Sequence, residues 1–89
     1  MRKSKGMNRK DVLNEIIKAI NKVKKTDYKI NNIQEDTFIG GDLGVSSVEM
    51  LEVIFDIRKA LNIKSDQEEV DEIYTMKDGI DYLLKLMGK

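Results

Sequence analysis

Apolar residues recur at three- and four-residue steps in three separate stretches of this 89-residue chain. That spacing places them on one face of an α-helix. The pattern predicts one helix that begins near Asn8 or Arg9 and runs to about residue 24, a second over 47–61, and a third over about 76–87. The chain has no proline to interrupt these stretches, so we expect an all-α domain.

Capping residues mark further helix starts in the C-terminal third of the chain. Ser65 and Glu68 form a capping box that opens a short helix ending near residue 74, and Thr75 caps the last helix, with Gly88 as its stop. The expected fold is a small four-helix bundle of three longer helices and one short one. Gly79 costs about 1 kcal/mol relative to alanine inside the last helix, which predicts the close approach of another backbone.

A loop over residues 26–45 joins the first two helices and is long for a domain of this size. Such a loop is unusual unless it has a function or is tied down. A short turn is expected to start at Asp36 or Thr37. Five spaced apolar residues are expected to anchor the loop to the helices: Ile30, Ile33, Phe38, Ile39 and Leu43.

The second predicted helix is more apolar than a single buried face requires. Its core face is expected to consist of Met50, Ile54, Ile57 and Leu61. Beside this face lie an apolar row of Val48, Leu51 and Phe55 and then an acidic row of Glu49, Glu52 and Asp56. We expect Leu51 to be mostly buried and Val48 and Phe55 to be partly exposed. The two rows are typical of a helix that docks a partner with a basic-rimmed groove, although the apolar row would also serve to cover the loop and the neighbouring helix.

Two adjacent serines lie where the loop ends and the second helix begins. Ser46 and Glu49 have the spacing of a capping box, in which the Ser46 oxygen accepts a hydrogen bond from the backbone of Glu49. Ser47 is then the first helical residue, with its hydroxyl free. The unpaired N–H groups and the positive dipole end of a helix start favour a bound or attached phosphate. The spacing therefore favours Ser47 over Ser46 as a site of modification.

The chain has neither cysteine nor histidine. It therefore lacks the usual ligands of thiolate and zinc sites and the partners of Ser–His or Cys–His nucleophiles, and we expect no metal site and no enzyme activity. No apolar run is long enough to span a membrane, and residues 1–8 are basic without the apolar stretch of a signal peptide. These features favour a cytoplasmic protein with a disordered tail over 1–8 and one domain over 9–87.

A net charge of zero conceals a strong asymmetry along the chain. Residues 1–33 hold ten Lys or Arg and three Asp or Glu, a net +7, whereas residues 34–72 hold three and eleven, a net −8. An acidic middle favours basic protein surfaces as partners. No aromatic residue is interleaved among the basic residues of the tail, so we expect neither nucleic acid nor a membrane as a partner.

Residues 42–49 read Asp-Leu-Gly-Val-Ser-Ser-Val-Glu, with a serine at the sixth position from the aspartate. This run resembles the phosphopantetheine attachment site of the acyl carrier protein family, whose modified serine corresponds to Ser47. Thr-Phe-Ile over 37–39 resembles the loop that precedes that site, and residues 68–83 resemble the third and fourth helices of the family. The likeness extends over about residues 9–87.

The resemblance implies that a phosphopantetheinyl transferase moves 4′-phosphopantetheine from coenzyme A onto Ser47, forming a phosphodiester. The terminal thiol of that group would hold acyl intermediates as thioesters and present them to enzymes of a fatty-acid, polyketide or related biosynthetic pathway. Asp42, Leu43 and Gly44 would belong to the attachment site, and the apolar and acidic rows would bind partner enzymes with basic docking surfaces. A monomer is expected.

Two departures from the family pattern fall on the surface that partners would contact. Ser46 stands where the family usually has aspartate, so the common Asp-Ser-Leu reads Ser-Ser-Val here. Arg58 and Lys59 also make the second helix less acidic than in fatty-acid carriers. Both departures favour a specialised carrier over a housekeeping carrier of fatty-acid synthesis.

Two alternatives remain at the level of sequence. A peptidyl or D-alanyl carrier protein would use the same scaffold. From a different class, the chain would be a small helical protein- or DNA-binding module that uses its basic first helix. The acidic second helix and the missing turn signature of a helix-turn-helix argue against the DNA-binding alternative.

Overall fold

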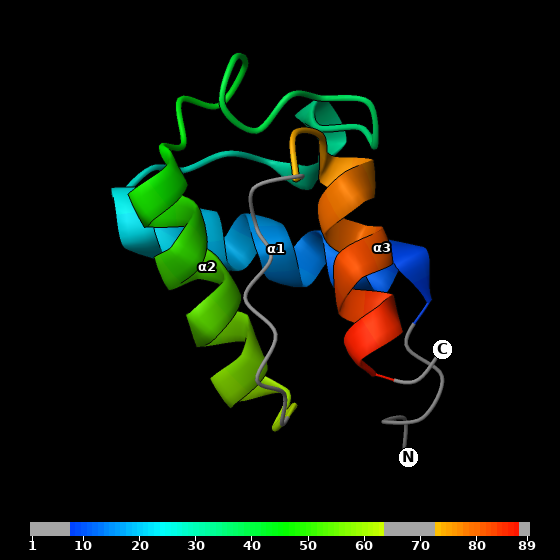
Figure 1. Cartoon of the computed structure of the whole chain (residues 1–89). Helices are drawn as coiled ribbons and strands as arrows, with labels where there is room; N and C mark the ends of the chain where they lie inside the picture. The colour runs from blue at the N-terminus through cyan, green and yellow to red at the C-terminus, as the bar shows by residue number, and fades with distance from the viewer. Residues whose placement is uncertain (1–7, 64–72, 88–89) are drawn as a thin grey trace.

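The computed structural model describes residues 8–63 and 73–87 of the chain. Within them the chain forms α1 (Arg9–Lys24), α2 (Ser47–Ala60) and α3 (Met76–Leu86), and a short 3₁₀ helix, η1 (Ile30–Asn32), lies in the first loop (Figure 1). The prediction of an all-helical fold is confirmed for these residues, and the three long helices begin where the sequence predicts. The 3₁₀ helix was not predicted from the sequence.

The described residues contain three α-helices rather than four. The short helix predicted over 65–74 lies mostly outside the described residues, and Ile73 and Tyr74 at its expected end are not helical. The backbone of Tyr74 instead pairs with the first loop, where the Ile39 N–H donates to the Tyr74 carbonyl at 2.8 Å. The described residues therefore contain three α-helices and one 3₁₀ turn, and the fourth helix remains a prediction. The predicted stop at Gly88 and the basic tail up to residue 7 also lie outside the described residues.

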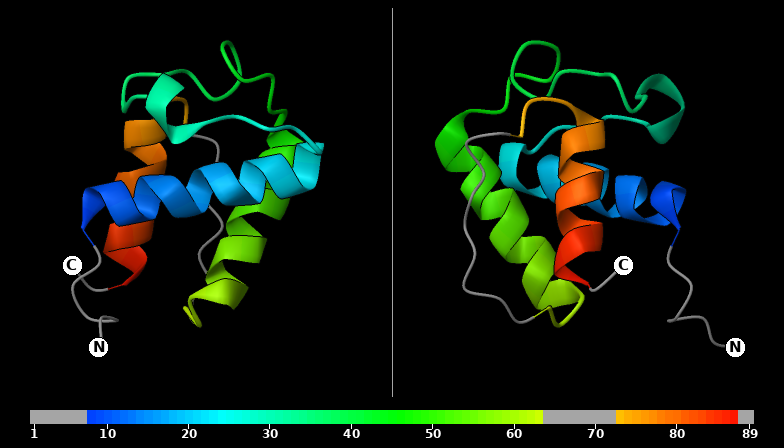
Figure 2. Two further views of the ribbon diagram at one scale, coloured as in Figure 1. Left: turned by 180° about the vertical axis from the view of Figure 1, so that it is seen from behind. Right: turned by 45° about the vertical axis from the view of Figure 1, so that its right-hand side comes forward.

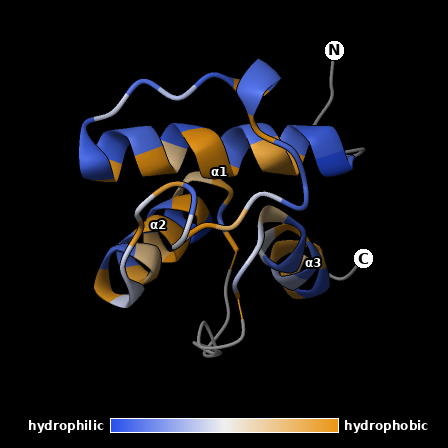
Figure 3. Cartoon of the chain, turned by 90° about the horizontal axis from the view of Figure 1, so that it is seen from above, coloured by the Kyte–Doolittle hydropathy of each residue, from blue (hydrophilic) through white to orange (hydrophobic). Residues whose placement is uncertain are grey.

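α1 is the central element of the fold. It crosses both other helices, and within the described ranges close backbone approaches link α1 to α2 and α1 to α3 but not α2 to α3 (Figure 2). Seen from above, the apolar faces of the three helices turn toward a shared interior (Figure 3). The largest side chains that are fully buried there are Ile16, Ile20, Ile39, Ile57, Met76, Ile80 and Leu83. Burial of one such side chain contributes about 1.5–3 kcal/mol, so this interior is the main source of stability.

Each α-helix begins with a capping box. Asn8 caps α1, Ser46 caps α2 and Thr75 caps α3, and in every case the side chain of the third helical residue also accepts a hydrogen bond from the backbone of the cap. The reciprocal pair satisfies backbone N–H groups that a helix start would otherwise leave without partners. No helix formed by the described residues is both long and apolar enough to cross a membrane.

The first loop is tied to the rest of the fold by side chains and by backbone. Ile33, Ile39 and Leu43 are buried and Ile30 is partly buried, as predicted. The prediction for Phe38 was wrong, because its side chain is 54% exposed. Its backbone provides the anchor instead. Phe38 and Thr75 form an isolated antiparallel bridge, flanked by the 2.8 Å hydrogen bond from Ile39 and a 3.0 Å hydrogen bond from Met76 N–H to the Thr37 carbonyl.

Arg9 links three elements at the start of α1. Its guanidinium contacts Glu35 of the loop at 2.8 Å and Asp81 of α3 at 2.7 Å. Hydrogen bonds from Arg9 are the main cause that lowers the pKa of both carboxyl groups. All three side chains are at least 40% exposed, so this network positions the loop more than it stabilises the fold.

Gly79 of α3 faces the interior. A Cβ atom at this position would lie 3.4 Å from Ile16 Cδ1 and 3.7 Å from Ile73 Cγ2. The sequence predicted the close approach of another backbone, and that prediction was wrong, because the neighbours are side-chain methyl groups. At these distances an alanine Cβ would make ordinary van der Waals contacts.

Candidate functional site

The start of α2 divides two roles between its adjacent serines. The Ser46 Oγ accepts from the backbone N–H of Glu49 at 3.2 Å, and Glu49 Oε1 accepts from the backbone N–H of Ser46 at 2.9 Å. The predicted capping register is confirmed. Ser46 therefore uses its hydroxyl oxygen to close the helix, and Ser47 is the first residue within it.

Ser47 has the freer hydroxyl of the two. Its side chain is exposed, and it has no hydrogen-bond partner in the part of the chain that the structure describes. The first N–H groups of α2 lack partners within the helix, so they add positive electrostatic potential beside this hydroxyl. The position suits the attachment of a negatively charged phosphate ester.

Lys24 brings a positive charge from the end of α1 to the start of α2. Its Nζ lies 3.3 Å from Glu49 Oε1 and its side chain is only 20% exposed. The pKa of Glu49 is lowered, first by the hydrogen bond from the Ser46 backbone and then by Lys24. Glu49 is thus held in its ionised form by contacts within the chain, which fixes the capping box in place.

Asp42, Leu43 and Gly44, which lie shortly before the two serines, shape the loop. Asp42 Oδ2 accepts from the Phe38 N–H at 2.9 Å, so its carboxylate closes the turn. Leu43 is buried, and its carbonyl accepts from the Tyr28 hydroxyl at 3.0 Å. Gly44 has a φ of +70°, a conformation that side chains disfavour. The structure therefore gives Asp42, Leu43 and Gly44 a clear role in positioning the helix start, and none of them lines the cleft beside Ser47.

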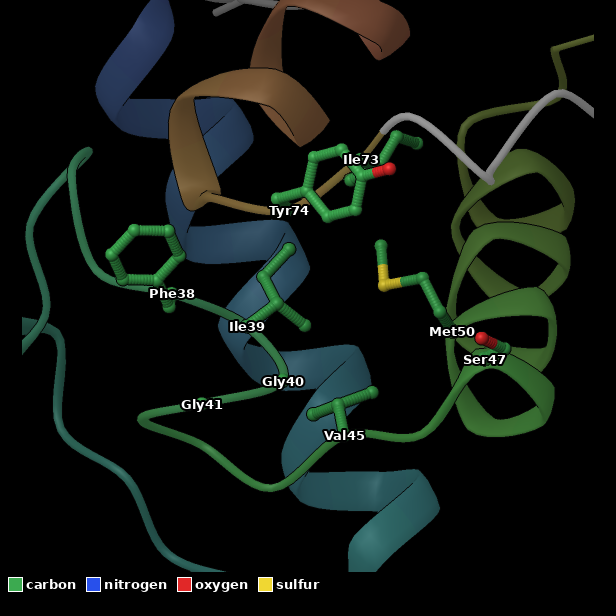
Figure 4. A pocket seen from close by; sticks show the side chains of 9 residues that line it. All are labelled: Phe38, Ile39, Gly40, Gly41, Val45, Ser47, Met50, Ile73 and Tyr74. Carbon is green, nitrogen blue, oxygen red and sulfur yellow. The ribbon is translucent and has the colours of Figure 1, made fainter.

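A cleft of about 220 Å³ lies next to Ser47 (Figure 4). Its apolar wall comes from four buried side chains of the loop, α2 and the segment before α3, namely Ile39, Val45, Met50 and Ile73. Gly40 and Gly41 form another part of its border without side chains. Two aromatic residues, Phe38 and Tyr74, complete the lining and are 54% and 62% exposed.

Sequence reasoning did not find Tyr74 or Ile73 as neighbours of the serine. They lie at the expected end of a predicted helix, 26 or more positions away along the chain. Only the pairing of Phe38 with Thr75 brings the segment before α3 to the loop that ends at Ser47. The one signal in the sequence was that Thr75 starts a helix, which leaves Tyr74 outside it.

The predicted apolar row lies on the outer side of α2 and is exposed to solvent. Val48, Leu51 and Phe55 are 66%, 42% and 64% exposed. The expectation that Leu51 is mostly buried was wrong. Val53 takes the core position instead, next to Met50, Ile54 and Ile57. Lys59 lies over the Phe55 ring, with its Nζ 5.9 Å from the ring centroid.

The acidic row is largely paired within the protein. Glu49 contacts Lys24, and Asp56 lies 3.1 Å from Lys22 of α1. Glu52 is exposed and forms no ion pair with the described residues. The acidic row therefore presents less free negative charge than the count of its carboxylates implies.

Comparison with known proteins finds several curated relatives named acyl carrier protein. The relative from Buchnera aphidicola subsp. Acyrthosiphon pisum is 31% identical over 61 residues, which cover 68% of this chain and 76% of the relative. That from Porphyromonas gingivalis is 27% identical over 63 residues, 71% of this chain and 81% of the relative. That from Desulforapulum autotrophicum is 26% identical over 69 residues, 78% of this chain and 90% of the relative.

No family model matches the chain, and no solved structure matches it either. The identity and coverage of the curated relatives are nevertheless sufficient to assign a family, and the helical fold is compatible with that family. The family is one of carriers rather than enzymes. The chain therefore belongs to the acyl carrier protein family.

Proposed function

We propose that this protein carries acyl intermediates as thioesters on a 4′-phosphopantetheine group attached to Ser47. The observation that carries the proposal is the division of roles at the start of α2. Ser46 closes the helix through its hydrogen bond with Glu49, and Ser47 has an exposed hydroxyl without a partner among the described residues. One of two adjacent serines is thus structural and the other is available for modification.

The surroundings of Ser47 fit a phosphopantetheine group. The positive end of α2 would accommodate the charge of a phosphodiester, and the adjacent cleft has both apolar walls and a glycine border. The group would supply a thiol, which this chain lacks because it has no cysteine. In the attachment reaction, the Ser47 oxygen would bond to phosphorus, the pyrophosphate linkage of coenzyme A would break, and adenosine bisphosphate would leave.

The pathway served is proposed to be a specialised one, for a polyketide, peptide-like or modified acyl group. Ser46 caps α2 as aspartate would, but it does so without a negative charge beside the attachment site. Arg58 and Lys59 add positive charge in the last turn of the same helix. A partner enzyme that selects an acidic helix start would therefore bind this carrier less well.

The exposed apolar row of α2 is proposed as the main surface by which the transferase and the acyl-processing enzymes bind. Glu49 and Asp56 are already paired with lysines of α1, so Glu52 is the member of the acidic row best able to meet a basic group of a partner. Exposed apolar side chains in the centre of an interface commonly provide most of its binding energy. Glu52 would then orient the partner more than hold it.

The proposal is tested by incubating the protein with coenzyme A, Mg²⁺ and a broad-specificity phosphopantetheinyl transferase and measuring the intact mass. We expect the wild-type protein and Ser46→Ala to gain one phosphopantetheine each, and Ser47→Ala to gain none. The Ser46→Ala protein is a matched control, since it removes the neighbouring hydroxyl and keeps Ser47. A wild-type protein that gains no mass would refute the carrier proposal.

A further inference from the structure

The cleft beside Ser47 has an unusual border of two exposed aromatic rings. Phe38 comes from the first loop and Tyr74 from the segment before α3, and both line the same cleft as Ser47 (Figure 4). Together they are two of the five large apolar or aromatic side chains that are strongly exposed among the described residues. The other three form the apolar row of α2, on a different part of the surface.

The backbone of both aromatic residues is fixed by short hydrogen bonds. Phe38 N–H donates to Asp42 at 2.9 Å, and Tyr74 N–H donates to Asp78 at 2.9 Å. The Tyr74 carbonyl in turn accepts from Ile39 at 2.8 Å. The two rings thus project from a rigid frame, although neither is needed to fill the core. Exposed side chains on a backbone that is fixed in this way are suited to contact a ligand.

The size of the cleft limits what enters it. Its volume is about 220 Å³, whereas pockets for drug-sized ligands are about 300–1,000 Å³. A short acyl group or a single ring fits this volume, and a long saturated chain does not. The wall of Ile39, Val45, Met50 and Ile73 is apolar and buried, which favours an uncharged acyl group over a charged one.

We propose that Phe38 and Tyr74 make this carrier selective for short, flat, unsaturated acyl groups, such as an arylacyl or a conjugated enoyl group, which the cleft shelters from solvent. This inference rests on the proposed attachment at Ser47, because the occupant of the cleft is the acyl end of the group attached there. Pairs of aromatic rings prefer offset-stacked or edge-to-face contact, and such pairs are more favourable than the area they bury would give. Tyr74 acts through its ring, so its hydroxyl is dispensable.

The experiment compares thioester lifetimes. Wild-type protein is loaded by the transferase from cinnamoyl-, 3-phenylpropionyl-, butyryl- and palmitoyl-coenzyme A, and cleavage by hydroxylamine is followed by intact mass. Each rate is divided by the rate for the same acyl-coenzyme A, which removes differences in intrinsic reactivity. We expect the cinnamoyl group to be protected about two- to tenfold more than butyryl, because a pair of aromatic rings gains more than the area it buries. The 3-phenylpropionyl group carries the same ring on a flexible saturated linker and should be protected to an intermediate degree. Palmitoyl should be the least protected.

Three matched variants test the rings themselves. Phe38→Leu and Tyr74→Leu keep an apolar side chain and should abolish the extra protection of the cinnamoyl group, whereas Tyr74→Phe should retain it. Lys85→Leu, which changes an exposed residue in the last turn of α3, should also retain it. Circular dichroism melts of all four variants establish that they remain folded.

Nuclear Overhauser contacts in the wild-type protein provide a test that needs no variant. We expect contacts from the cinnamoyl ring protons to the rings of Phe38 and Tyr74. Equal protection of all four acyl groups, or an absence of these contacts in a protein that does load at Ser47, would overturn the inference and leave the proposed function intact. A protein that fails to load at all would instead refute the proposed function.

Discussion

α2 and α3 both start with a capping box, but the two helix starts have different roles. Ser46 with Glu49 and Thr75 with Asp78 form equivalent capping boxes, each with two reciprocal hydrogen bonds. The residue that follows the cap differs. At α3 it is Met76, which is fully buried, and at α2 it is Ser47, which is exposed. The capping box thus starts a helix without specifying a function. The residue after the cap makes the difference, because it packs in the core at α3 and is exposed for modification at α2.

The largest contrast between the two starts is expected in stability. Met76→Ala removes a fully buried side chain and should lower the free energy of unfolding by about 2–5 kcal/mol. Ser47→Ala changes an exposed residue and should alter it by about 0.5 kcal/mol or less. Urea titrations of the two proteins measure the difference. Equal losses would mean that Ser47 is part of the packed structure and not free for modification.

The second contrast concerns the outer surfaces. Phe55→Ser removes the aromatic member of the apolar row and should lower the kcat/KM of the transferase by about tenfold, since interface residues of this kind cost more than about 1 kcal/mol when truncated. Lys77→Ser changes an exposed side chain of α3, so it serves as the control and should leave that rate unchanged. If Phe55→Ser and Lys77→Ser are both folded and the rate for Phe55→Ser is unaltered, Phe55 does not contribute to partner binding.

The two caps themselves should behave alike. Ser46→Ala and Thr75→Ala each remove a side-chain oxygen that accepts a backbone N–H, and each should destabilise the protein by about 1 kcal/mol. Thermal or urea unfolding measures both. If Thr75→Ala lowers the stability and Ser46→Ala does not, Ser46 does not stabilise the start of α2, and the reason for choosing Ser47 over Ser46 is removed.

The smallest effect is a shared dependence on acid pH. The pKa of Glu49 is lowered first by the hydrogen bond from the Ser46 backbone, and that of Asp78 first by the hydrogen bond from the Tyr74 backbone. A lowered pKa in the folded state contributes stability above the ordinary carboxyl pKa, and that stability is lost as the pH falls through the lowered value. Glu49→Gln and Asp78→Asn should each reduce the difference in urea midpoint between pH 7 and pH 3. An unchanged difference in both variants would contradict the capping role of the carboxylates.

Local patterns predicted the helices of this protein well. The capping boxes at Ser46 and Thr75 and the spacing of apolar residues in α1 depend only on residues close together in the chain, so they are legible in the sequence. The choice between Ser46 and Ser47 belongs to the same class. The assignment of Ser47 as the modified residue remains a prediction.

Features that depend on distant contacts were missed. α2 is apolar on two sides, so periodicity alone could not decide whether Leu51 or Val53 faces the core. In the folded protein Val53 is buried and Leu51 is exposed. The exposure of Phe38 likewise follows from its bridge to Thr75, 37 positions away. The same bridge brings Tyr74 to the cleft. The sequence thus predicted the serine of the candidate site but not Ile73 and Tyr74, which line the other side of the cleft and come from a distant part of the chain.

Fragment-ion mapping of the wild-type protein after incubation with coenzyme A and the transferase tests the central claim most directly. The peptide that spans residues 42–52 contains both serines, and fragments cut between Ser46 and Ser47 locate the added mass without any substitution. The division of roles at the start of α2 predicts that the phosphopantetheine lies on Ser47, with Ser46 unmodified. Phosphopantetheine on Ser46, or none on this peptide, would contradict it.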